Sequence, residues 1–436
     1  MGLTVIKQAQ EKSCLRDEEL SRTVRGIIDN VRARGEAALL EYAEQFDKTD
    51  METVRVGREM VLSAYNKLPP QTIEAMRFAH SRIKDFAERQ RSGLHEIGIK
   101  DKGVELSYRL LPVESCGCYV PAGRHPLPSS ALMSITTAKA AGVRRIAACS
   151  PPSCSGGGVH PSVLAAMDIA GADEIYCMGG AGAIAAFAYG FSGINAGGAV
   201  QKVDMIAGPG NRFVTEAKRQ VIGDVGIDGF AGPSEVLIIA DKTANPKFIA
   251  ADLLAQAEHD TDAQAELVCM DKTTIDKTLV ELEKQLALLP TKETAALSWA
   301  DNGKIYLADT LDDAIDLANR RAPEHIELQL DPETCKYGRG RLNAYGSLFA
   351  GHYAPAAFGD FVSGTNHILP TMGSARFTGA LWAGSFLRAA FYQSISKEGC
   401  AALAGPCVTL AETEGLFAHR RAVEIRLDSE AARSGG

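Results

Sequence analysis

The chain has no apolar run long enough to cross a membrane, and it has no basic patch of the kind that binds nucleic acid. A transmembrane helix needs about 20 consecutive apolar residues, and the first residues hold no long apolar core typical of a secretion signal. The net charge of -8 is modest, and both signs are mixed along the chain, which argues against nucleic acid or an anionic membrane as the main partner. We therefore expect a cytoplasmic protein with neither of these partners.

The sequence also lacks the cysteine spacings typical of a disulfide framework or a structural zinc site, although it contains ten cysteines. Cys149, Cys177 and Cys269 lie inside apolar, strand-like runs, where a free cysteine behaves as a small buried hydrophobe. Cys116 and Cys118 are separated by one residue, fewer than the two or more residues of structural zinc pairs. We expect reduced thiols and no disulfides.

What is present is a regular alternation of strands and helices. The length of 436 residues is too great for one ordinary core and predicts two or three domains. Residues 18–95 have a helical pattern, and a strand, glycine turn and helix pattern follows. Strands are expected at residues 113–120, 145–150, 174–178, 202–207, 235–240, 265–270 and 304–307. This rhythm predicts an α/β fold with two Rossmann-like domains, mostly parallel sheets, and helical extensions at both ends.

Glu324 and His325 form a candidate acid/base pair at the start of a strand. Thr310 is a candidate N-cap for a helix that Pro323 ends, since proline disfavours helix in the residue before it. From Ile326, apolar and polar residues alternate, which predicts a half-buried strand. A rigid strand can aim a general acid/base pair at its end. Alone, however, such a pair is more often an exposed surface feature.

Two glycine loops could hold a phosphate. Gly180, Gly182 and Ala185 match the G-x-G-x-x-A spacing of dinucleotide sites and stand between an expected strand and helix, as phosphate binding requires. The match is incomplete. A dinucleotide site needs an acidic residue at the end of the next strand to bind the ribose, but Asp204 stands near the start of that strand. A second loop contains Gly210. Each loop alone is more often a tight turn without a ligand.

Several polar pairs could hold a divalent metal ion. Asn245 and the proline after it begin a helix on which Gln256 and His259 are three residues apart, so both side chains can reach one point. A buried, hydrogen-bonded histidine is the plainer explanation of His259. Two further pairs stand later in the chain, Asp360 with His367 and Glu414 with His419. Each of these pairs could instead face solvent.

Four separated motifs, in order along nearly the whole chain, resemble histidinol dehydrogenase. They are Gly232-Pro-Ser234-Glu-Val-Leu, Ala255-Gln256-Ala-Glu-His259, Ala322-Pro-Glu-His325, and Gly359-Asp360 through Gly364-Thr-Asn-His367-Ile-Leu-Pro-Thr. Glu414 and His419 fall where that family has its C-terminal pair. Such a set of motifs is far more specific than any one of them.

The resemblance implies a zinc-dependent homodimer that oxidises L-histidinol through the aldehyde to L-histidine, the last step of histidine biosynthesis, using two NAD in succession. It implies that His325 takes the hydroxyl proton and Glu324 activates a water. The zinc ligands would be Gln256, His259, Asp360 and His419, with His419 from the other subunit. The substrate would contact these four residues together with Ser234, His325, His367 and Glu414, and NAD would contact Tyr119, Gly182 and Asn211.

The resemblance also implies a division of the chain. We expect an N-terminal arm at residues 1–17 and a discontinuous main α/β domain at residues 18–118 and 235–381. A second Rossmann-like domain at residues 119–234 would contact NAD, and residues 382–436 would form a C-terminal helical dimerisation arm. Within this arm, helices are expected at residues 388–396 and 406–417.

The chain departs from the family pattern at three places. Gly182 stands where the family usually has a glutamine that contacts the cofactor, and the loss of that hydrogen bond, about 1 kcal/mol, predicts weaker or altered NAD binding. Ala122 in the run 121–123 replaces a more usual glycine. Asp260 replaces a glycine that commonly ends the helix of His259.

Two other functions fit the same motifs. Some relatives oxidise other primary alcohols that bear an acid group, such as sulfopropanediol, and the residues around the substrate would decide between them: His125, Ser234, Arg388 and Glu414. The carboxylate of Glu414 favours a substrate ammonium or imidazole over a sulfonate. The third possibility is a catalytically silent zinc-binding relative, against which the intact Glu324 and His325 argue.

Overall fold

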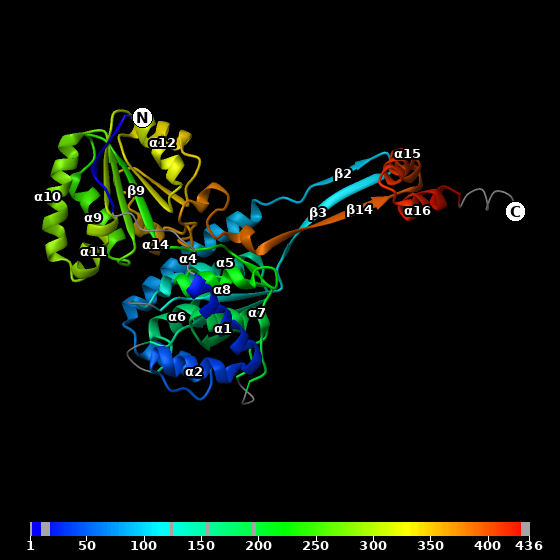
Figure 1. Ribbon diagram of the computed structural model, residues 1–436, viewed down its shortest axis with the longest axis horizontal. Coiled ribbons are helices and arrows are strands. Elements are labelled where there is room, and N and C mark those ends of the chain that lie inside the picture. Colours follow the sequence, from blue (N-terminus) through cyan, green and yellow to red (C-terminus); the bar gives the residue numbers. More distant parts are fainter. Residues whose placement is uncertain (1, 10–17, 123–124, 154–156, 194–197, 429–436) are drawn as a thin grey trace. The chain divides into compact units, whose positions relative to one another are not determined.

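The computed structural model describes residues 2–9, 18–122, 125–153, 157–193 and 198–428. By internal packing the chain divides into two units. The first holds residues 1–91 and 113–386, and the second holds residues 92–112 and 387–436. Figure 1 labels helices and strands of both units.

Four helices occupy most of the first hundred residues and confirm the helical pattern expected there. They are α1 (Glu18–Arg34), α2 (Glu36–Asp47), α3 (Arg58–Asn66) and α4 (Pro70–Ser92). Each buries one stripe of apolar residues; in α1 the stripe consists of Val24, Ile28 and Val31. Of the expected N-terminal arm, residues 3–7 form a strand, and residues 10–17 lie outside the described part of the chain.

The first sheet has five strands, in the strand order of a Rossmann fold. Its parallel strands are β4 (Ser115–Tyr119), β5 (Arg145–Ser150), β6 (Glu174–Cys177), β7 (Met205–Ala207) and β8 (Gly226–Ile227), in the order β6-β5-β4-β7-β8. The intervening helices are α5 (Pro128–Ala141), α6 (Pro161–Ala170), α7 (Gly180–Tyr189) and α8 (Arg212–Val221). The chain reverses its direction of travel across the sheet between β4 and β7, which is the position where such sheets bind ligands.

The packing of α1 and α2 differs from the expected grouping of residues 18–118 with residues 235–381. Val24 and Leu39 join the core formed on the sheet of β4 by Phe187 of α7 and Val214 of α8. The reason is local: α7 is built almost entirely of alanine and glycine, and small side chains allow another helix to approach closely. The stripe of α1 therefore finds its partner in this sheet.

The second sheet has six strands, and it repeats the Rossmann order with one added edge strand. Its members are β1 (Leu3–Lys7), β9 (Glu235–Ala240), β10 (Gln264–Cys269), β11 (Lys304–Ala308), β12 (His325–Gln329) and β13 (Ser347–Ala350), in the order β1-β11-β10-β9-β12-β13. Strands β9 to β13 are parallel, and β1 joins the edge antiparallel to β11. The expected α/β fold with two Rossmann-like, mostly parallel sheets is thus confirmed.

Helices cover both faces of this second sheet (Figure 1). One face carries α9 (Pro246–Ala257), α10 (Lys272–Leu288) and α11 (Lys292–Asn302), and the other carries α12 (Leu311–Arg321) and α13 (Pro332–Arg341). The short helix α14 (Ala356–Phe361) and two 3-10 turns, η1 (Ser374–Arg376) and η2 (Ala383–Phe386), follow β13. Because both faces are covered, all five residues of β12 are buried, and the prediction of a half-buried strand was wrong.

The second unit contains strands as well as helices. It consists of β2 (Gly98–Asp101), β3 (Val104–Pro112), β14 (Leu387–Ile395), α15 (Lys397–Thr413) and α16 (Phe417–Asp428). The helix expected at residues 388–396 was wrong: this segment is β14, which pairs antiparallel with β3 along its whole length. The helix expected at residues 406–417 is the end of α15 and the first residue of α16. Among the described residues, no helix has the length and apolar character needed to cross a bilayer.

Candidate active site

Local sequence signals place Glu324 and His325 at the start of β12. The side chain of Thr310 caps α12 by accepting from the backbone N–H of Asp313 at 3.1 Å. The helix ends before Ala322, whose φ of +49° lies in the left-handed region. A non-glycine residue there is uncommon and strained, and Ala322 is fully buried. A strained turn thus leads directly into the acid/base pair.

Glu324 is a buried carboxylate that two donors hold in place. Its Oε2 accepts from the Ser234 hydroxyl at 2.6 Å and from the backbone N–H of Glu235 at 2.9 Å. Burial raises the pKa of Glu324, while His325 and the two hydrogen bonds oppose this increase. A carboxylate with a raised pKa is suited to accept a proton near neutral pH. Ser234, expected to bind the substrate, therefore also orients Glu324.

His325 lies between two carboxylates. Its Nδ1 is 3.0 Å from the carbonyl oxygen of Glu235, which can only accept, so Nδ1 carries a hydrogen. Nδ1 is also 3.5 Å from Glu324 Oε2, and Nε2 is 3.5 Å from Asp360 Oδ1. Burial alone would lower the pKa of His325, but Glu324 and Asp360 together raise it to about 9. The ring also stacks on Phe349, with centroids 6.0 Å apart.

Asp360 and His367 are joined through the backbone. His367 Nδ1 is 2.9 Å from the carbonyl oxygen of Asp360, and His367 Nε2 is 3.2 Å from the hydroxyl of Ser130 on α5. Burial lowers the pKa of His367. Burial alone would raise the pKa of Asp360, but the neighbouring histidines, His325 first, keep it below its usual value. Asp360 is therefore ionised near neutral pH.

Gln256 and His259 stand at the end of α9, which Asn245 caps by accepting from a backbone N–H. Gln256 is buried, and its Nε2 has no hydrogen-bond partner. His259 is exposed, and it is close enough to Asp360 to lower the pKa of that carboxyl. A buried amide without a partner at this position indicates a group that another molecule completes.

The residues fit a zinc ion only in part within the first unit. Among the described residues, no three His, Cys, Asp or Glu side chains form a metal-binding cluster. An imidazole nitrogen, a carboxylate oxygen and an amide oxygen are ligands of the kind that zinc accepts, and His259 is close enough to Asp360 to lower the pKa of that carboxyl. Glu414 and His419 are both exposed in the second unit, where Glu414 directly follows α15 and His419 belongs to α16.

Tyr119 and Asn211 lie at the two strand ends where the first sheet reverses direction. Tyr119 ends β4, and Asn211 caps α8 just after β7 with its side-chain oxygen. Gly208, between them, has a φ of +119°, and a Cβ there would lie 2.0 Å from the Tyr119 carbonyl oxygen. Only glycine fits this turn. The loop is held by buried Lys218, which donates to the Gly208 carbonyl at 2.7 Å and pairs with Asp228.

Gly182 does not lie at this strand reversal. A Cβ at position 182 would point at Leu39 of α2, 2.9 Å from Cδ2, and at Tyr42, 3.6 Å away. The position faces the packing between α7 and α2, where the tip of Leu39 takes the space of any longer side chain. The role of residue 182 toward NAD therefore stays a prediction.

The other two departures from the family pattern have local effects. The carboxylate of Asp260 accepts from the backbone N–H of Asp262 at 3.1 Å, which forms a turn of the kind that Asp favours. The backbone φ of Asp260 is not positive, so the turn does not require a glycine at this position. Ala122 forms an isolated bridge with Pro126, and Gly123 lies outside the described residues.

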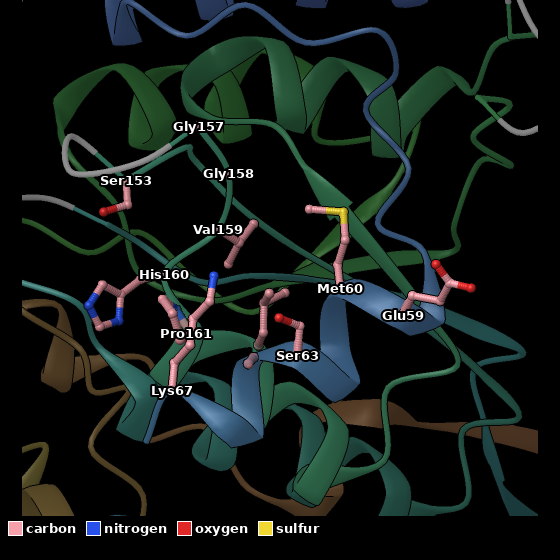
Figure 2. A pocket seen from close by; sticks show the side chains of 12 residues that line it. Glu59, Met60, Ser63, Lys67, Ser153, Gly157, Gly158, Val159, His160 and Pro161 are labelled. Carbon is pink, nitrogen blue, oxygen red and sulfur yellow. The ribbon is translucent and has the colours of Figure 1, made fainter. Parts of the chain in front are cut away.

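A large cavity lies apart from all of these residues. Figure 2 shows it between α3, which contributes Met60 and Lys67, and the segment before α6, which contributes Gly158 and His160. Its volume is about 550 Å³. It contains none of the residues that the sequence assigned to the site.

Three residues near the site were missed from the sequence. Ser130 contacts His367, Phe349 stacks on His325, and Glu327 is buried two residues after His325. The only signal for Ser130 was its place at the start of an expected helix. Nothing in the sequence distinguished Glu327 from a solvent-facing residue of an alternating strand.

Comparisons with known proteins show which family the chain resembles in full. The sequence profile described as histidinol dehydrogenase matches residues 10–427. A histidinol dehydrogenase of Agrobacterium fabrum is 46% identical over 418 residues, which cover 95% of this chain and 94% of that protein. A protein of Shouchella clausii named "histidinol dehydrogenase homolog" is 41% identical, with 97% and 98% covered.

A solved structure agrees with the sequence comparisons. The crystal structure of histidinol dehydrogenase from Elizabethkingia anophelis superposes on this chain with a TM-score of 0.89. The two sequences are 34% identical, and the match covers 97% of this chain and 95% of that protein chain. The profile, the relatives and the fold all extend over nearly the whole chain. The chain therefore belongs to the histidinol dehydrogenase family of NAD-dependent oxidoreductases that act on an alcohol.

Proposed function

We propose that the protein oxidises L-histidinol to L-histidine in two NAD-dependent steps, as the last step of histidine biosynthesis, in a zinc-dependent cytoplasmic homodimer. One observation carries the proposal most strongly. Ser234, Glu324, His325, Asp360 and His367, far apart in the sequence, form one continuous series of contacts in a chain of this family. Glu414 and His419 would complete the site from the partner subunit.

The reaction requires two hydride transfers and one water. The alcohol loses a hydride and a proton to become the aldehyde, water adds to the aldehyde, and the hydrate loses a second hydride and proton to become the carboxylic acid. NAD, when bound, would supply the hydride acceptor for each half. In total, one alcohol, one water and two NAD+ give one carboxylate, two NADH and three protons.

His325 is placed to take the hydroxyl proton. Its Nδ1 hydrogen is fixed on the Glu235 carbonyl, so Nε2 is the nitrogen that faces the site, where its neighbour is Asp360 Oδ1 at 3.5 Å. Because the pKa of His325 is raised to about 9, the imidazole carries a proton on both nitrogens at neutral pH, and it must release the proton on Nε2 before it can take the hydroxyl proton. The Phe349 ring keeps the imidazole plane in one orientation.

Glu324 is placed to remove a proton from the water that attacks the aldehyde. Two donors hold Oε2, which leaves Oε1 as the oxygen that can accept from water. Burial keeps other water away and raises the pKa of the carboxyl. The same carboxylate can thus act in the second half of the reaction without changing its position.

Two groups from outside the chain would be held as follows. Gln256, His259 and Asp360, with His419 of the other subunit, would hold zinc, which supplies a Lewis acid that orients the amino alcohol. Tyr119 and Asn211 would contact NAD at the strand reversal of the first sheet. Gly182 is proposed with them from the family pattern alone.

The test is the number of NADH formed per L-histidinol consumed by zinc-loaded protein, with and without a chelator. We expect two NADH, and none after chelation. His259→Ala should lower bound zinc measured by elemental analysis, whereas His160→Ala, which changes a histidine at the start of α6, should not. One NADH per substrate, or full activity after chelation, would contradict the proposal.

The alternative is a relative that oxidises another primary alcohol, such as sulfopropanediol. It rests on the acid/base pair, which is not specific for one alcohol. Glu324 and His325 would serve either alcohol. No NADH from L-histidinol, together with NADH from a sulfonated or carboxylated alcohol, would select this alternative; no NADH from any alcohol would indicate a silent zinc-binding protein.

A further inference from the structure

A buried group of polar side chains lies behind the reacting pair, on the same strand. Glu327 and Gln329 of β12 are each 1% exposed. The Nε2 of Gln329 donates to Asp252 Oδ2 at 3.0 Å and lies 3.4 Å from Glu327 Oε2. Two carboxyl groups therefore approach one amide in the interior. Such a costly arrangement requires a full set of hydrogen bonds.

Glu327 provides the cap that α14 lacks. The residue before this helix is Pro355, whose side chain cannot accept a hydrogen bond, and Glu327 Oε1 instead accepts from the backbone N–H of Ala356 at 2.8 Å. The helix has only six residues, far fewer than an isolated helix needs in water. Its position therefore depends on contacts from the rest of the fold. Asp360 is near its far end.

The opposite end of α14 is held by a second contact. The Asp360 carbonyl oxygen is bound to His367 Nδ1 at 2.9 Å. Between the two ends, Gly359 lies directly against the ring of Phe349. Glu327 and His367 thus fix the two ends of one short helix. Together they set the position of the Asp360 carboxylate.

The other half of the buried group connects β12 to α9. Asp252 belongs to α9, and the last turn of that helix and the residue pair beyond it carry Gln256 and His259. Burial and the charge of Glu327 raise the pKa of Asp252 to about 9, and burial raises the pKa of Glu327. At neutral pH the two carboxyl groups together retain a proton, so Asp252 and Glu327 can bind each other.

We propose that Glu327 is a positioning residue that fixes α14 on β12 and, through Asp252 and Gln329, connects it to α9, so that Asp360 and Gln256 face one metal ion. The inference rests on the proposed zinc site. Glu327 binds the backbone of α14 and acts through the helices that carry the ligands.

Two changes remove the hydrogen bond to α14 from opposite sides. Glu327→Leu removes the acceptor, and Ala356→Pro removes the donor at the first helical position, where proline is well tolerated. We expect zinc affinity, measured by competition with a chromophoric chelator, to fall about 10-fold in each, as when groups behind metal ligands are removed. At saturating zinc, the loss in kcat should be smaller than the loss in zinc affinity. Glu327→Gln retains an oxygen acceptor and should bind zinc nearly as the wild type does.

The matched control is Asp271→Ala, which removes the cap of α10. Asp271 accepts from the backbone N–H of Thr274 at 2.8 Å, and α10 carries none of the site residues. This variant should unfold at a lower temperature but bind zinc like the wild type. If Glu327→Leu does not fold, Ala356→Pro decides the result alone.

The outcomes separate the inference from the proposed function. Zinc affinity within twofold of the wild type in Glu327→Leu or Ala356→Pro would overturn the role of Glu327 and leave the zinc site intact. A wild-type protein without zinc affinity would overturn the proposed metal site and the inference with it. Equal losses in Asp271→Ala and Glu327→Leu would also overturn the inference, because the effect would then be general destabilisation.

Discussion

Gly359→Ala should damage the site through one added methyl group. A Cβ at position 359 would lie 2.6 Å from both Cε1 and Cζ of Phe349 and 3.5 Å from Thr365 Oγ1. Carbon atoms in contact are about 3.5–4.0 Å apart, so helix and ring must separate by about 1 Å. The same Phe349 ring stacks on His325, at a centroid distance of 6.0 Å.

The required movement reaches a reacting group in either direction. If α14 moves, Asp360 moves with it; if the ring moves, it presses on His325. Overpacking of this kind costs about 1–3 kcal/mol of stability, and a misplacement of about 1 Å lowers the rate of a positioned reaction by about 100-fold. We therefore expect Gly359→Ala to lower kcat by about one to two orders of magnitude and to lower the free energy of unfolding by about 1–3 kcal/mol.

The assay is NADH formation from L-histidinol, with urea unfolding of the same samples. Gly26→Ala is the control, because Gly26 lies on the exposed side of α1 with no heavy atom within 4 Å of the added methyl. It should raise stability by about 0.5–1 kcal/mol and leave kcat unchanged. Combining Gly359→Ala with Phe349→Leu should restore part of the lost rate, since the shorter side chain makes room.

The reasoning would be refuted by a Gly359→Ala enzyme with wild-type kcat and stability. Strictly additive losses in the double variant would refute it too, because two groups that collide should show a coupling energy of about 0.5–3 kcal/mol.

Three further predictions concern buried charges. Glu324→Gln can still accept from the Glu235 N–H but cannot take a proton, so NADH per L-histidinol should fall from two towards one; an unchanged ratio would remove Glu324 from the second half. Asp228→Asn leaves the Lys218 ammonium buried and should cost about 3–5 kcal/mol in urea unfolding; a loss below about 1 kcal/mol would contradict this. For Asp252, the folded pKa of about 9 exceeds the ordinary value of about 4, so its contribution to stability is full below about pH 4 and is lost as the pH rises to about 9. Asp252→Asn should therefore gain stability relative to the wild type between pH 5 and pH 9, and parallel curves for the two proteins would contradict the shift.

Helix starts and buried strands could be predicted because their signals are local. Thr310 and Asn245 cap the helices that follow them, and a cap requires only an acceptor side chain within three residues of its donor. The apolar runs of β9 and β10 are buried as expected. The alternation of such strands with helices then predicts parallel sheets, whichever residues complete the cores.

Strand β14 could not be predicted in the same way. Leu387–Ile395 contains no glycine or proline, and its small and apolar residues also fit one face of a helix. Its backbone is paired with β3, which lies far away in the sequence. Tertiary pairing, and not local preference, makes this segment a strand.

The polar residues of β12 misled for a related reason. Alternation of apolar and polar residues normally means that one face meets solvent. In β12, both faces are covered, and the partners of Glu327 and Gln329 are Asp252 on a preceding helix and the backbone of Ala356. Nothing in the spacing of Glu327 or Gln329 shows that these partners exist.

The candidate site itself followed from family resemblance and not from spacing. The Ser234 hydroxyl and the Glu324 carboxylate that it binds are 90 residues apart, and the backbone of Asp360 meets His367 only through the turn after α14. Each residue alone fits an exposed position equally well. Only the fold shows that they converge.

The candidate site lies at the edge of the second sheet opposite to the one where ligands usually bind. In open α/β sheets, ligands bind beyond the carboxyl ends of the strands at the reversal point, and Tyr119 and Asn211, which we propose to contact NAD, lie at that point in the first sheet. In the second sheet the reversal lies between β9 and β12. Beyond the carboxyl ends of these strands, Asp241 accepts from Thr243 at 2.7 Å and from Asp331 at 3.3 Å, so the protein satisfies its own polar groups there.

At the amino ends, by contrast, polar groups remain unsatisfied. His325 begins β12, in register with Val236 of β9, and its Nε2 has no hydrogen-bond partner. A helix that starts at the carboxyl edge and runs back across the sheet ends at the amino edge, and α9 does so, with twelve residues. Because each residue of a helix turns it by about 100° and advances it by about 1.5 Å, a single deletion within α9 would turn Gln256 and His259 by that amount and take His259 away from Asp360, whose pKa it now lowers. The length of a crossover helix, and not only the identity of its residues, is therefore part of the site.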